Sequence, residues 1–575
     1  MAEYLSPGVY VEEFESGSKP MEGVSTSTAG FIGLAEKGPA AGIPELVTNI
    51  SDFRRIYGGY LSENEFGEYR YLAYAVEHFF LNGGSRAFIS RVAPEDAKCS
   101  EGLVPSEDAA KLSIAAKNPG VWGDNIRITF TPSSKAKTQI FEVLETNEGT
   151  KYVVKSAAGF NAGDIVSFND GETIVYNKVL KARDNIISFA EEFAGEVTDK
   201  GLIPTKFIQT EEFAMEVRYE DINEVYDNVS FNIEASNFIA NKTAKSDVIA
   251  ANYVGDYSEI ITPFKAIAGE ESVLSVTLKG GSNGDISGIT AADFIGKDAG
   301  AGQRTGIQSF LDNDLVSLLA MPGIVDPNAQ LMLVAHCESL GSRFAVLDVP
   351  KDEKKVADVI NHRNLFDSNY AALYHPWLTI FDPLSKKNIS IPPSGSVLGI
   401  YARSDNTRGV HKAPANEVVR GCVGLECNFN KGEQDILNPK GVNLIRSFAG
   451  QGIRVWGART VTSNASWKYI NVRRLFIFIE ETIKANTSWA VFEPNDEVLW
   501  VRVQRTISVF LTNMWRNGSL AGSSPEEAFF VNIGRDTMSQ DDIDNGRLIC
   551  VIGVAPVKPA EFVVFRISQK TADSE

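Results

Sequence analysis

The sequence predicts a multidomain protein of mixed α/β and α+β class, in which a β-rich domain is inserted into an α/β core. Segments typical of buried strands alternate with segments of helical periodicity on both sides of a central region of short strands and turns. Isolated strand-like segments also lie near both ends of the chain. At 575 residues, the chain is too long for one ordinary domain.

These changes of pattern divide the chain into five parts. They are an N-terminal arm and linker (residues 1–29), the first part of the α/β core (30–123), an inserted β-rich domain that could comprise two nested parts (124–280), the second part of the core (281–439), and a C-terminal α+β domain that ends in a strand (440–575). The turn-forming run Gly280–Gly284 marks the end of the insertion.

The N-terminal region contains one alternating apolar segment, Val9–Phe14, among many Gly, Ser, Thr and Pro residues. The alternation predicts a strand, and the composition of Ser16–Thr28 predicts a flexible linker. Because no neighbouring segment offers a hairpin partner, this strand needs a sheet edge from elsewhere, and another subunit is one source.

The core is predicted from alternating strands and helices, which favour a mostly parallel sheet covered by helices. Its first part contains strands at Phe31–Ala35 and Ala87–Val92 and helices at Ser51–Tyr57 and Tyr69–Phe80. Its second part contains strands at Leu315–Ala320, Arg343–Asp348, Tyr370–Tyr374 and Leu378–Phe381, a helix from the cap Asp326 to Gly341, and a helix at Val356–Asn364.

The insertion and the C-terminal region carry their own signals. In the insertion, two alternating runs within Asp164–Tyr176 flank Asn169-Asp170-Gly171, which predicts a hairpin. In the C-terminal region we expect a hairpin from Val442–Phe448 and Ile453–Thr460, two amphipathic helices with apolar stripes from Val472 to Ile483 and from Leu499 to Met514, and a last strand at Glu561–Ile567.

Composition excludes several classes of partner. A formal charge of −19 and a pI near 4.9 disfavour binding to nucleic acid or to anionic membranes. The N-terminal residues do not resemble a signal peptide, and the apolar runs are shorter than the roughly 20 residues needed to span a bilayer. Five scattered cysteines without a CxxC pair favour synthesis in a reducing cytoplasm.

No catalytic, cofactor or metal site is predicted. The five histidines, His78, His336, His362, His375 and His411, show no metal-binding spacing. The run Gly296-Lys297-Asp298 lacks the Ser or Thr of a phosphate loop, and Asp541–Gly546 departs from a calcium loop at Ile543. The sequence therefore indicates a structural role.

Several motifs resemble those of contractile phage tail sheath proteins. They are Tyr4-Leu-Ser-Pro-Gly-Val-Tyr-Val-Glu-Glu13, Ser25-Thr-Ser-Thr-Ala-Gly-Phe-Ile-Gly33, Pro393-Ser-Gly-Ser-Val-Leu-Gly399, Val455-Trp-Gly-Ala-Arg-Thr460, Trp467-Lys-Tyr-Ile-Asn-Val-Arg-Arg474, Val491-Phe-Glu-Pro-Asn495 and Ile552-Gly-Val-Ala-Pro-Val-Lys-Pro-Ala-Glu-Phe562. They occur in the family's order and cover roughly residues 4–123 and 280–568, whereas the insertion matches only loosely.

The resemblance implies a subunit that polymerises as stacked hexameric rings around an inner tube and contracts to drive the tube through a cell envelope. It implies as partners further copies of the chain, the inner tail tube protein, the baseplate and the tail terminator, and no cofactor, nucleic acid or membrane insertion. It also implies assembly in the host bacterial cytoplasm and a final place in a virion tail or a phage-tail-like particle.

The resemblance assigns roles to two sets of residues. Strand exchange between subunits is expected at Val9, Tyr10, Val11, Phe14, Phe562, Val563, Val564, Phe565 and Ile567. Because the family's C-terminal domain faces the tube, the tube-contact candidates are Arg473, Arg474, Lys484, Arg502 and Arg505.

Other interpretations remain open at this stage. The sheath could belong to a virus, a phage-tail-like bacteriocin or another extracellular injection system, whereas the two-chain type VI sheaths fit less well. An enzyme on a Rossmann-like sheet is disfavoured because no strand-to-helix turn carries a phosphate fingerprint. A static adhesin or shell protein would explain the insertion but not the terminal arms.

Overall fold

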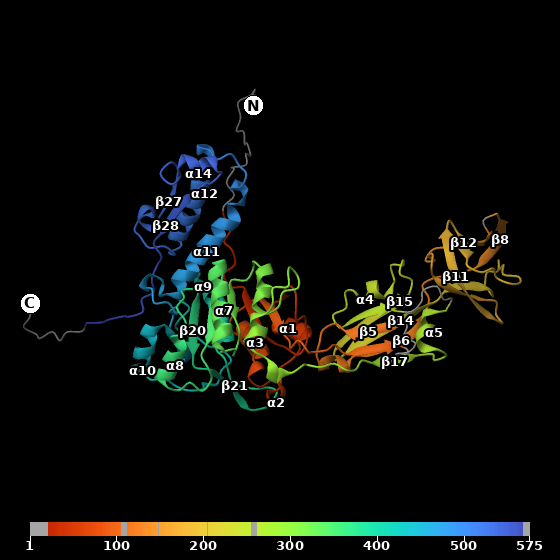
Figure 1. Ribbon diagram of the computed structural model, residues 1–575, viewed down its shortest axis with the longest axis horizontal. Coiled ribbons are helices and arrows are strands. Elements are labelled where there is room, and N and C mark those ends of the chain that lie inside the picture. Colours follow the sequence, from red (N-terminus) through yellow and green to blue (C-terminus); the bar gives the residue numbers. More distant parts are fainter. Residues whose placement is uncertain (1–20, 105–111, 148, 204, 255–260, 567–575) are drawn as a thin grey trace, which may run out of the picture.

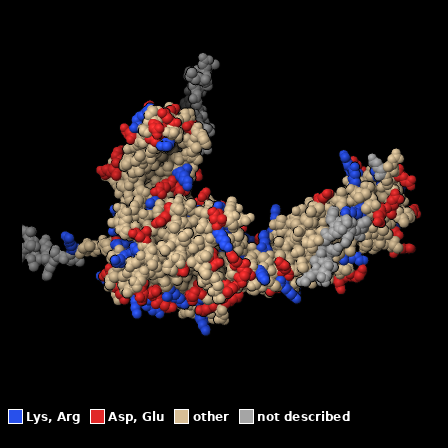
Figure 2. Space-filling model, viewed as in Figure 1, with Lys and Arg blue, Asp and Glu red and all other residues tan. Residues whose placement is uncertain are grey.

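The computed structural model describes residues 21–104, 112–147, 149–203, 205–254 and 261–566. Figure 1 shows a central α/β body, a helical unit above it and a long β-rich extension on one side. The extension narrows where it joins the body, and its tip lies farthest from the C-terminal segment (Figure 2).

The body is built on a nine-stranded sheet with the order β2-β3-β1-β18-β19-β20-β25-β26-β23. The strands are β1 (Ala29–Leu34), β2 (Glu45–Val47), β3 (Ala87–Val92), β18 (Leu318–Ala320), β19 (Phe344–Asp348), β20 (Ala371–His375), β23 (Glu417–Val418), β25 (Val442–Phe448) and β26 (Gly452–Val455). The run from β3 to β25 is parallel, and the other pairings are antiparallel. This arrangement confirms the predicted parallel core, but the predicted core strand Leu378–Phe381 (β21) lies in a separate sheet, where it pairs antiparallel with β22 (Asn388–Ile391).

The helices of the body are α1 (Ile50–Tyr57), α2 (Glu63–Phe66), α3 (Leu72–Leu81), α6 (Ala291–Ile295), α7 (Pro327–Leu340), α8 (Val356–Arg363), α9 (Ser394–Arg408) and α10 (Lys431–Leu437). Helix α7 begins at Asp326, whose carboxylate accepts from the Asn328 and Ala329 amides, and ends at Gly341 in the left-handed region, as predicted. Helix α1 is capped by Asn49 rather than by the predicted Ser51. The predicted helix at Tyr69–Phe80 forms only from Leu72.

Helix α9 was not predicted as a helix, although its sequence supplied one of the family motifs. It packs against α3 so closely that a Cβ on Gly395 would lie 2.3 Å from the Ala75 carbonyl oxygen, and a Cβ on Gly399 2.4 Å from that of Phe79. Glycines four residues apart share one helix face and let two backbones approach. The glycines that weaken a helix in isolation are therefore required by its packing.

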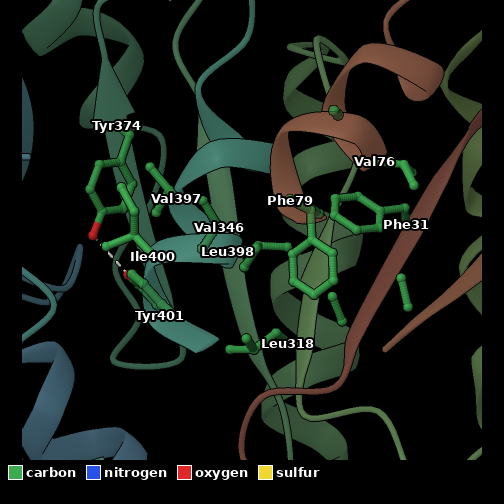
Figure 3. Close-up of a cluster of buried hydrophobic side chains, with 14 of the residues drawn as sticks. Phe31, Val76, Phe79, Leu318, Val346, Tyr374, Val397, Leu398, Ile400 and Tyr401 are labelled. Carbon is green, nitrogen blue, oxygen red and sulfur yellow. Dashed lines mark hydrogen bonds between the residues drawn. The ribbon is translucent and has the colours of Figure 1, made fainter. Parts of the chain in front are cut away.

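Aromatic and branched side chains fill the space between these helices and one face of the sheet (Figure 3). The rings of Phe31 and Phe79 meet edge to face at 5.5 Å. The buried hydroxyls of Tyr374 and Tyr401 hydrogen-bond to each other at 2.8 Å. A second buried cluster covers the opposite face of the sheet, so that both faces are dry, as a parallel sheet requires.

The described residues of the β-rich extension form three sheets. Its strands are β4 (Glu101–Val104), β5 (Leu112–Ala116), β6 (Arg127–Ser133), β7 (Lys137–Thr138), β8 (Ile140–Thr146), β9 (Gly149–Val154), β10 (Ile165–Asn169), β11 (Ile174–Arg183), β12 (Ile186–Phe189), β13 (Phe207–Thr210), β14 (Glu212–Tyr219), β15 (Ile222–Val229), β16 (Ile249–Tyr253) and β17 (Leu274–Thr277). The predicted hairpin forms between β10 and β11.

The extension begins earlier than the predicted boundary after residue 123. Strands β4 and β5 pair with each other and β5 pairs with β16, and their apolar side chains join the core of the extension. Sequence pattern assigned this stretch to the α/β core, which is wrong, because strand pairing is decided by segments far apart in the chain. Two further helices of the extension are α4 (Ile239–Thr243) and α5 (Pro263–Ala268).

The C-terminal unit consists of α11 (Ile470–Asn486), α12 (Glu497–Arg516), the short helices α13 (Pro525–Ala528) and α14 (Gln540–Asp544), and the two-stranded sheet β27 (Phe529–Ile533) and β28 (Cys550–Val554). The predicted boundary at residue 440 is wrong, because β25 pairs with β20 and places the hairpin β25–β26 in the core sheet. Helix α12 is capped by Asp496, whose side chain accepts from the Leu499 amide at 2.9 Å.

The close approach of α3 and α9 yields a stability prediction. Gly395→Ala places a methyl group against backbone that cannot move aside, so we expect the free energy of unfolding to fall by about 1–3 kcal/mol in urea denaturation. Gly534→Ala is the matched control, because its Cβ would meet nothing within 4 Å. Equal stability of the two variants would contradict the packing argument.

Candidate assembly site

The C-terminal segment is anchored by hydrogen bonds at Glu561 and exposed directly after it. The Glu561 carboxylate accepts both Arg459 Nε at 2.8 Å and Arg459 Nη2 at 2.7 Å, Asn438 Nδ2 at 2.7 Å and the Tyr469 hydroxyl at 3.0 Å. Burial alone raises the pKa of Glu561, but these hydrogen bonds and the charge of Arg459 outweigh it and lower the pKa.

The four residues after Glu561 are apolar and exposed. Their exposed fractions are 73% for Phe562, 69% for Val563, 77% for Val564 and 83% for Phe565. The predicted strand at Glu561–Ile567 does not form within the chain as far as residue 566, and Ile567 lies outside the described residues. Four large apolar side chains in succession are unusual on a free surface and mark a surface for a partner.

The N-terminal strand residues Val9, Tyr10, Val11 and Phe14 also lie outside the described residues. From Met21 onward the predicted flexible linker packs against α11, because the Val24 amide donates to Thr482 Oγ1 at 3.3 Å. The expectation of a flexible linker through Thr28 is therefore wrong for its second half.

A buried ion pair fixes this linker. Arg474 on α11 donates to Asp405 on α9 through Nη1 at 3.0 Å and Nη2 at 2.5 Å, and Arg474 Nη2 also donates to the Thr26 carbonyl at 2.9 Å. The Thr26 hydroxyl donates to Asp405 Oδ2 at 2.6 Å. Three segments distant in sequence are thus joined by one set of charge-assisted hydrogen bonds.

The sheet β27–β28 is an incomplete structure by itself. The two strands pair antiparallel from Phe529↔Val554 to Ile533↔Cys550, and α12 covers the sheet, with Gln504 Nε2 donating to the Val531 carbonyl. Phe530 and Val551 are 50% and 44% exposed. Two strands alone are marginal in water, and each has a further edge that can accept another strand.

The structure separates the five tube-contact candidates. The prediction that Arg473 and Arg474 lie at the surface is wrong, because both side chains are buried. Arg473 donates to Glu480 and lies 4.6 Å from the rings of Tyr370 and Trp467. The amphipathic pattern placed both arginines near solvent, yet each is held by a partner from another segment, which sequence spacing cannot reveal.

Lys484, Arg502 and Arg505 are exposed, and the latter two lie on α12. The exposed face of α12 also carries Val498, Val501 and Val509, which sequence analysis did not identify. Their spacing places them on one side of the helix with Arg505. The only local signal was the presence of valines outside the predicted apolar stripe.

Phe492 precedes this face and is fully exposed, with a φ of +69°. A bulky residue rarely occupies the left-handed region, because its Cβ crowds the backbone. Its neighbour Val491 is 63% exposed. A strained, exposed aromatic residue next to exposed valines indicates a contact surface rather than a free loop.

The described residues contain no group of three or more His, Cys, Asp or Glu side chains placed to hold a metal ion. In the same part of the chain, no helix has both the length and the apolar character needed to cross a bilayer. Acidic and basic side chains are mixed over the face that Figure 2 shows, rather than gathered into a basic patch suited to nucleic acid.

Comparisons with known proteins agree with this picture. Residues 297–461 match the family described as phage tail sheath protein central domain, and residues 462–570 match the phage tail sheath C-terminal domain. A prophage major tail sheath protein of Pseudomonas aeruginosa (strain UCBPP-PA14) is 26% identical over 341 residues, which cover 56% of this chain and 84% of that protein. The tail sheath protein of Escherichia phage P2 is 22% identical over 334 residues, 55% of this chain and 82% of that protein.

A solved structure shares the fold over nearly the whole chain. It is the contracted sheath complex of PVC, an extracellular contractile injection system, with a TM-score of 0.52, 21% identity and coverage of 99% of both chains. The family matches and the relatives together define a structural protein of the tail sheath class. The chain belongs to the phage tail sheath family.

The buried histidines generate a pH prediction. Burial lowers the pKa of His78, His336, His362 and His375 to about 4, with the charge of Arg343 adding to the effect at His336. The unfolded chain binds protons at these rings below about pH 6.5, whereas the folded chain does so only near pH 4. The free energy of unfolding should therefore fall as the pH is lowered from about 6.5 to about 4.

Denaturant titrations across this pH range would check the prediction. His336→Gln is the informative variant, because a glutamine oxygen can still accept from Arg343, which lies 2.7 Å from the ring nitrogen. The free energy of unfolding of this variant should depend less steeply on pH, because unfolding takes up about one proton fewer. A stability independent of pH in the unaltered chain would refute the argument.

Proposed function

We propose that this chain polymerises with copies of itself into the contractile sheath of a phage tail or phage-tail-like particle, as hexameric rings stacked around an inner tube. The observation that carries the proposal is the exposed apolar run Phe562–Phe565 directly after the anchored Glu561. An extended segment of this kind gains most by adding a strand to a sheet in a neighbouring subunit.

The sheet β27–β28 is the proposed acceptor. It has two strands, exposed apolar residues and a helix that already covers one face, so added strands would extend an existing core. The segments Val9–Phe14 and Phe562–Ile567 are the proposed donors, one from each end of a neighbouring chain. The predicted inserted domain would then face outward, on the far side of the body from the C-terminal segment (Figure 1).

The exposed face of α12 is the proposed contact with the inner tube. Arg502, Arg505 and the valines beside them combine positive charge with apolar area, which suits an acidic partner with apolar patches. Baseplate and terminator proteins would contact the two ends of the sheath, and assembly would take place in the cytoplasm of the producing bacterium.

Contraction in this proposal needs no nucleotide. The work comes from the free-energy difference between two packings of the same subunits, which a barrier separates until the baseplate triggers. Main-chain pairing between arms and neighbouring sheets would keep the polymer connected while other interfaces exchange.

Assembly of the purified chain tests the proposal. The full chain should form hollow, helically striated tubes in negative-stain electron microscopy, and a chain lacking residues 1–20 should not. Val564→Pro should also prevent tubes, because proline removes a main-chain donor from an added strand. Val564→Thr is the control, since threonine retains strand propensity. Tubes formed equally by the proline variant would contradict arm exchange, and a wild-type monomer at high concentration would contradict autonomous polymerisation.

Charge reversal on α12 tests the tube contact separately. Arg502→Glu with Arg505→Glu should weaken co-sedimentation with preformed inner tubes by about tenfold, most clearly at low salt. Lys431→Glu with Lys440→Glu makes the same charge change on exposed residues of α10 and the turn that follows it. This control should leave binding unchanged, because α10 lies far from α12 (Figure 1). Equal losses in both double variants would indicate a general effect of charge instead.

A further inference from the structure

Two arginine–carboxylate pairs of the same chemistry hold the roots of both arms, that is, the residues at which the N-terminal and C-terminal arms leave the body. Arg459 donates to the Glu561 carboxylate through Nε and Nη2. Arg474 donates to the Asp405 carboxylate through Nη1 and Nη2, and the Thr26 hydroxyl donates to the same carboxylate. The arginine and carboxylate side chains are 12% and 18% exposed in the first pair, and 3% and 5% in the second. Bidentate pairs shielded from water fix direction as well as distance.

The two pairs are joined through a short, rigid segment. Tyr469, the residue before α11, donates to Glu561 and forms a β-bridge with Arg459. Arg474 follows on the second turn of α11, where it lies over the Tyr401 ring at 4.7 Å. Residues Arg459–Arg474 therefore form one base to which both chain ends are attached.

Each attachment stops close to the point where an arm begins. At the C-terminal end, the side chain of Glu561 is mostly buried, whereas that of Phe562 is 73% exposed. At the N-terminal end, the linker is held from Glu22, whose amide and carbonyl meet Asn486, through Thr26. Glu561 lies at one root and the segment from Glu22 to Thr26 at the other, and the apolar residues beyond Glu561 carry the proposed exchange.

We propose that Arg459 with Glu561 and Arg474 with Asp405 are positioning pairs, which fix both arms to one base so that the arms leave the subunit at a constant separation. This inference rests on the proposed function for its meaning. A neighbour that pulls on one arm then displaces the root of the other, and movement passes through the subunit instead of being absorbed by a loose linker.

Hydrogen exchange of the full-length soluble subunit tests the roots without any assembly. Glu561→Gln removes the charge but keeps the shape, and within the peptide 557–566 the Glu561 amide, which donates to the Pro559 carbonyl at 3.0 Å, should exchange about tenfold faster, which corresponds to a loss of about 1.4 kcal/mol. Thr26→Val keeps the Arg474–Asp405 pair intact, and exchange in residues 21–28 should become about threefold faster.

Glu216→Gln is the matched control, because Glu216 accepts from Arg218 through Nε at 2.9 Å and Nη2 at 2.7 Å on the exposed extension. It should leave both peptides unchanged. Helix α11 should keep its protection in all variants. Wild-type exchange of the amide at position 561 in Glu561→Gln, or an equal rise throughout α11, would overturn the inference.

Electron microscopy then separates this inference from the proposed function. Glu561→Gln should still form tubes but lose their helical order, because the arms can pair while their roots shift. Tubes of wild-type order from this variant would overturn the positioning role. Normal tubes from Val564→Pro would instead refute arm exchange and with it the proposed function.

Discussion

The buried pair between Arg474 and Asp405 holds together the parts of this protein that the chain order keeps apart. It joins α9 from the core, α11 from the C-terminal unit and the linker that precedes β1. A buried ion pair adds little stability over an apolar substitute, but removing one partner leaves a charge without solvation and costs about 3–5 kcal/mol. The pair therefore selects one arrangement of three segments more than it adds stability.

The extension is attached through another buried arginine, which donates to backbone carbonyls instead of a carboxylate. Arg91 on β3 donates to the carbonyls of Ala35, Gly38 and Pro119 at 3.1, 2.7 and 2.9 Å, so it ties the body to the start of the extension. Farther out, Lys135 pairs with the buried carboxylates of Asp164 at 2.8 Å and Glu212 at 3.3 Å. These polar contacts have fixed directions, so they define how the extension is oriented at both places.

Fixed orientations of this kind suit the proposed rearrangement of contacts between subunits. Buried apolar side chains cover both faces of the sheet in the body. On one of these faces, α3 and α9 pack with their backbones in close contact. Packed interiors transmit displacement instead of absorbing it. The places left unpaired in the described chain, namely Phe562–Phe565, the edges of β27–β28 and the exposed face of α12, are those where neighbours can bind.

The sequence by itself determined the parallel core, the helix between Asp326 and Gly341, the hairpin at Asn169–Gly171 and the apolar character of Phe562–Phe565, because these depend on local periodicity, caps and turn residues. Only the tertiary structure decided that β4 and β5 belong to the extension, that β25 belongs to the core sheet, and that Arg473 and Arg474 are buried. It also showed α9 to be a helix, whose glycines are explained by contact with α3. Strand pairing, ion pairing and close helix contact join residues far apart in the chain, so no local pattern specifies them.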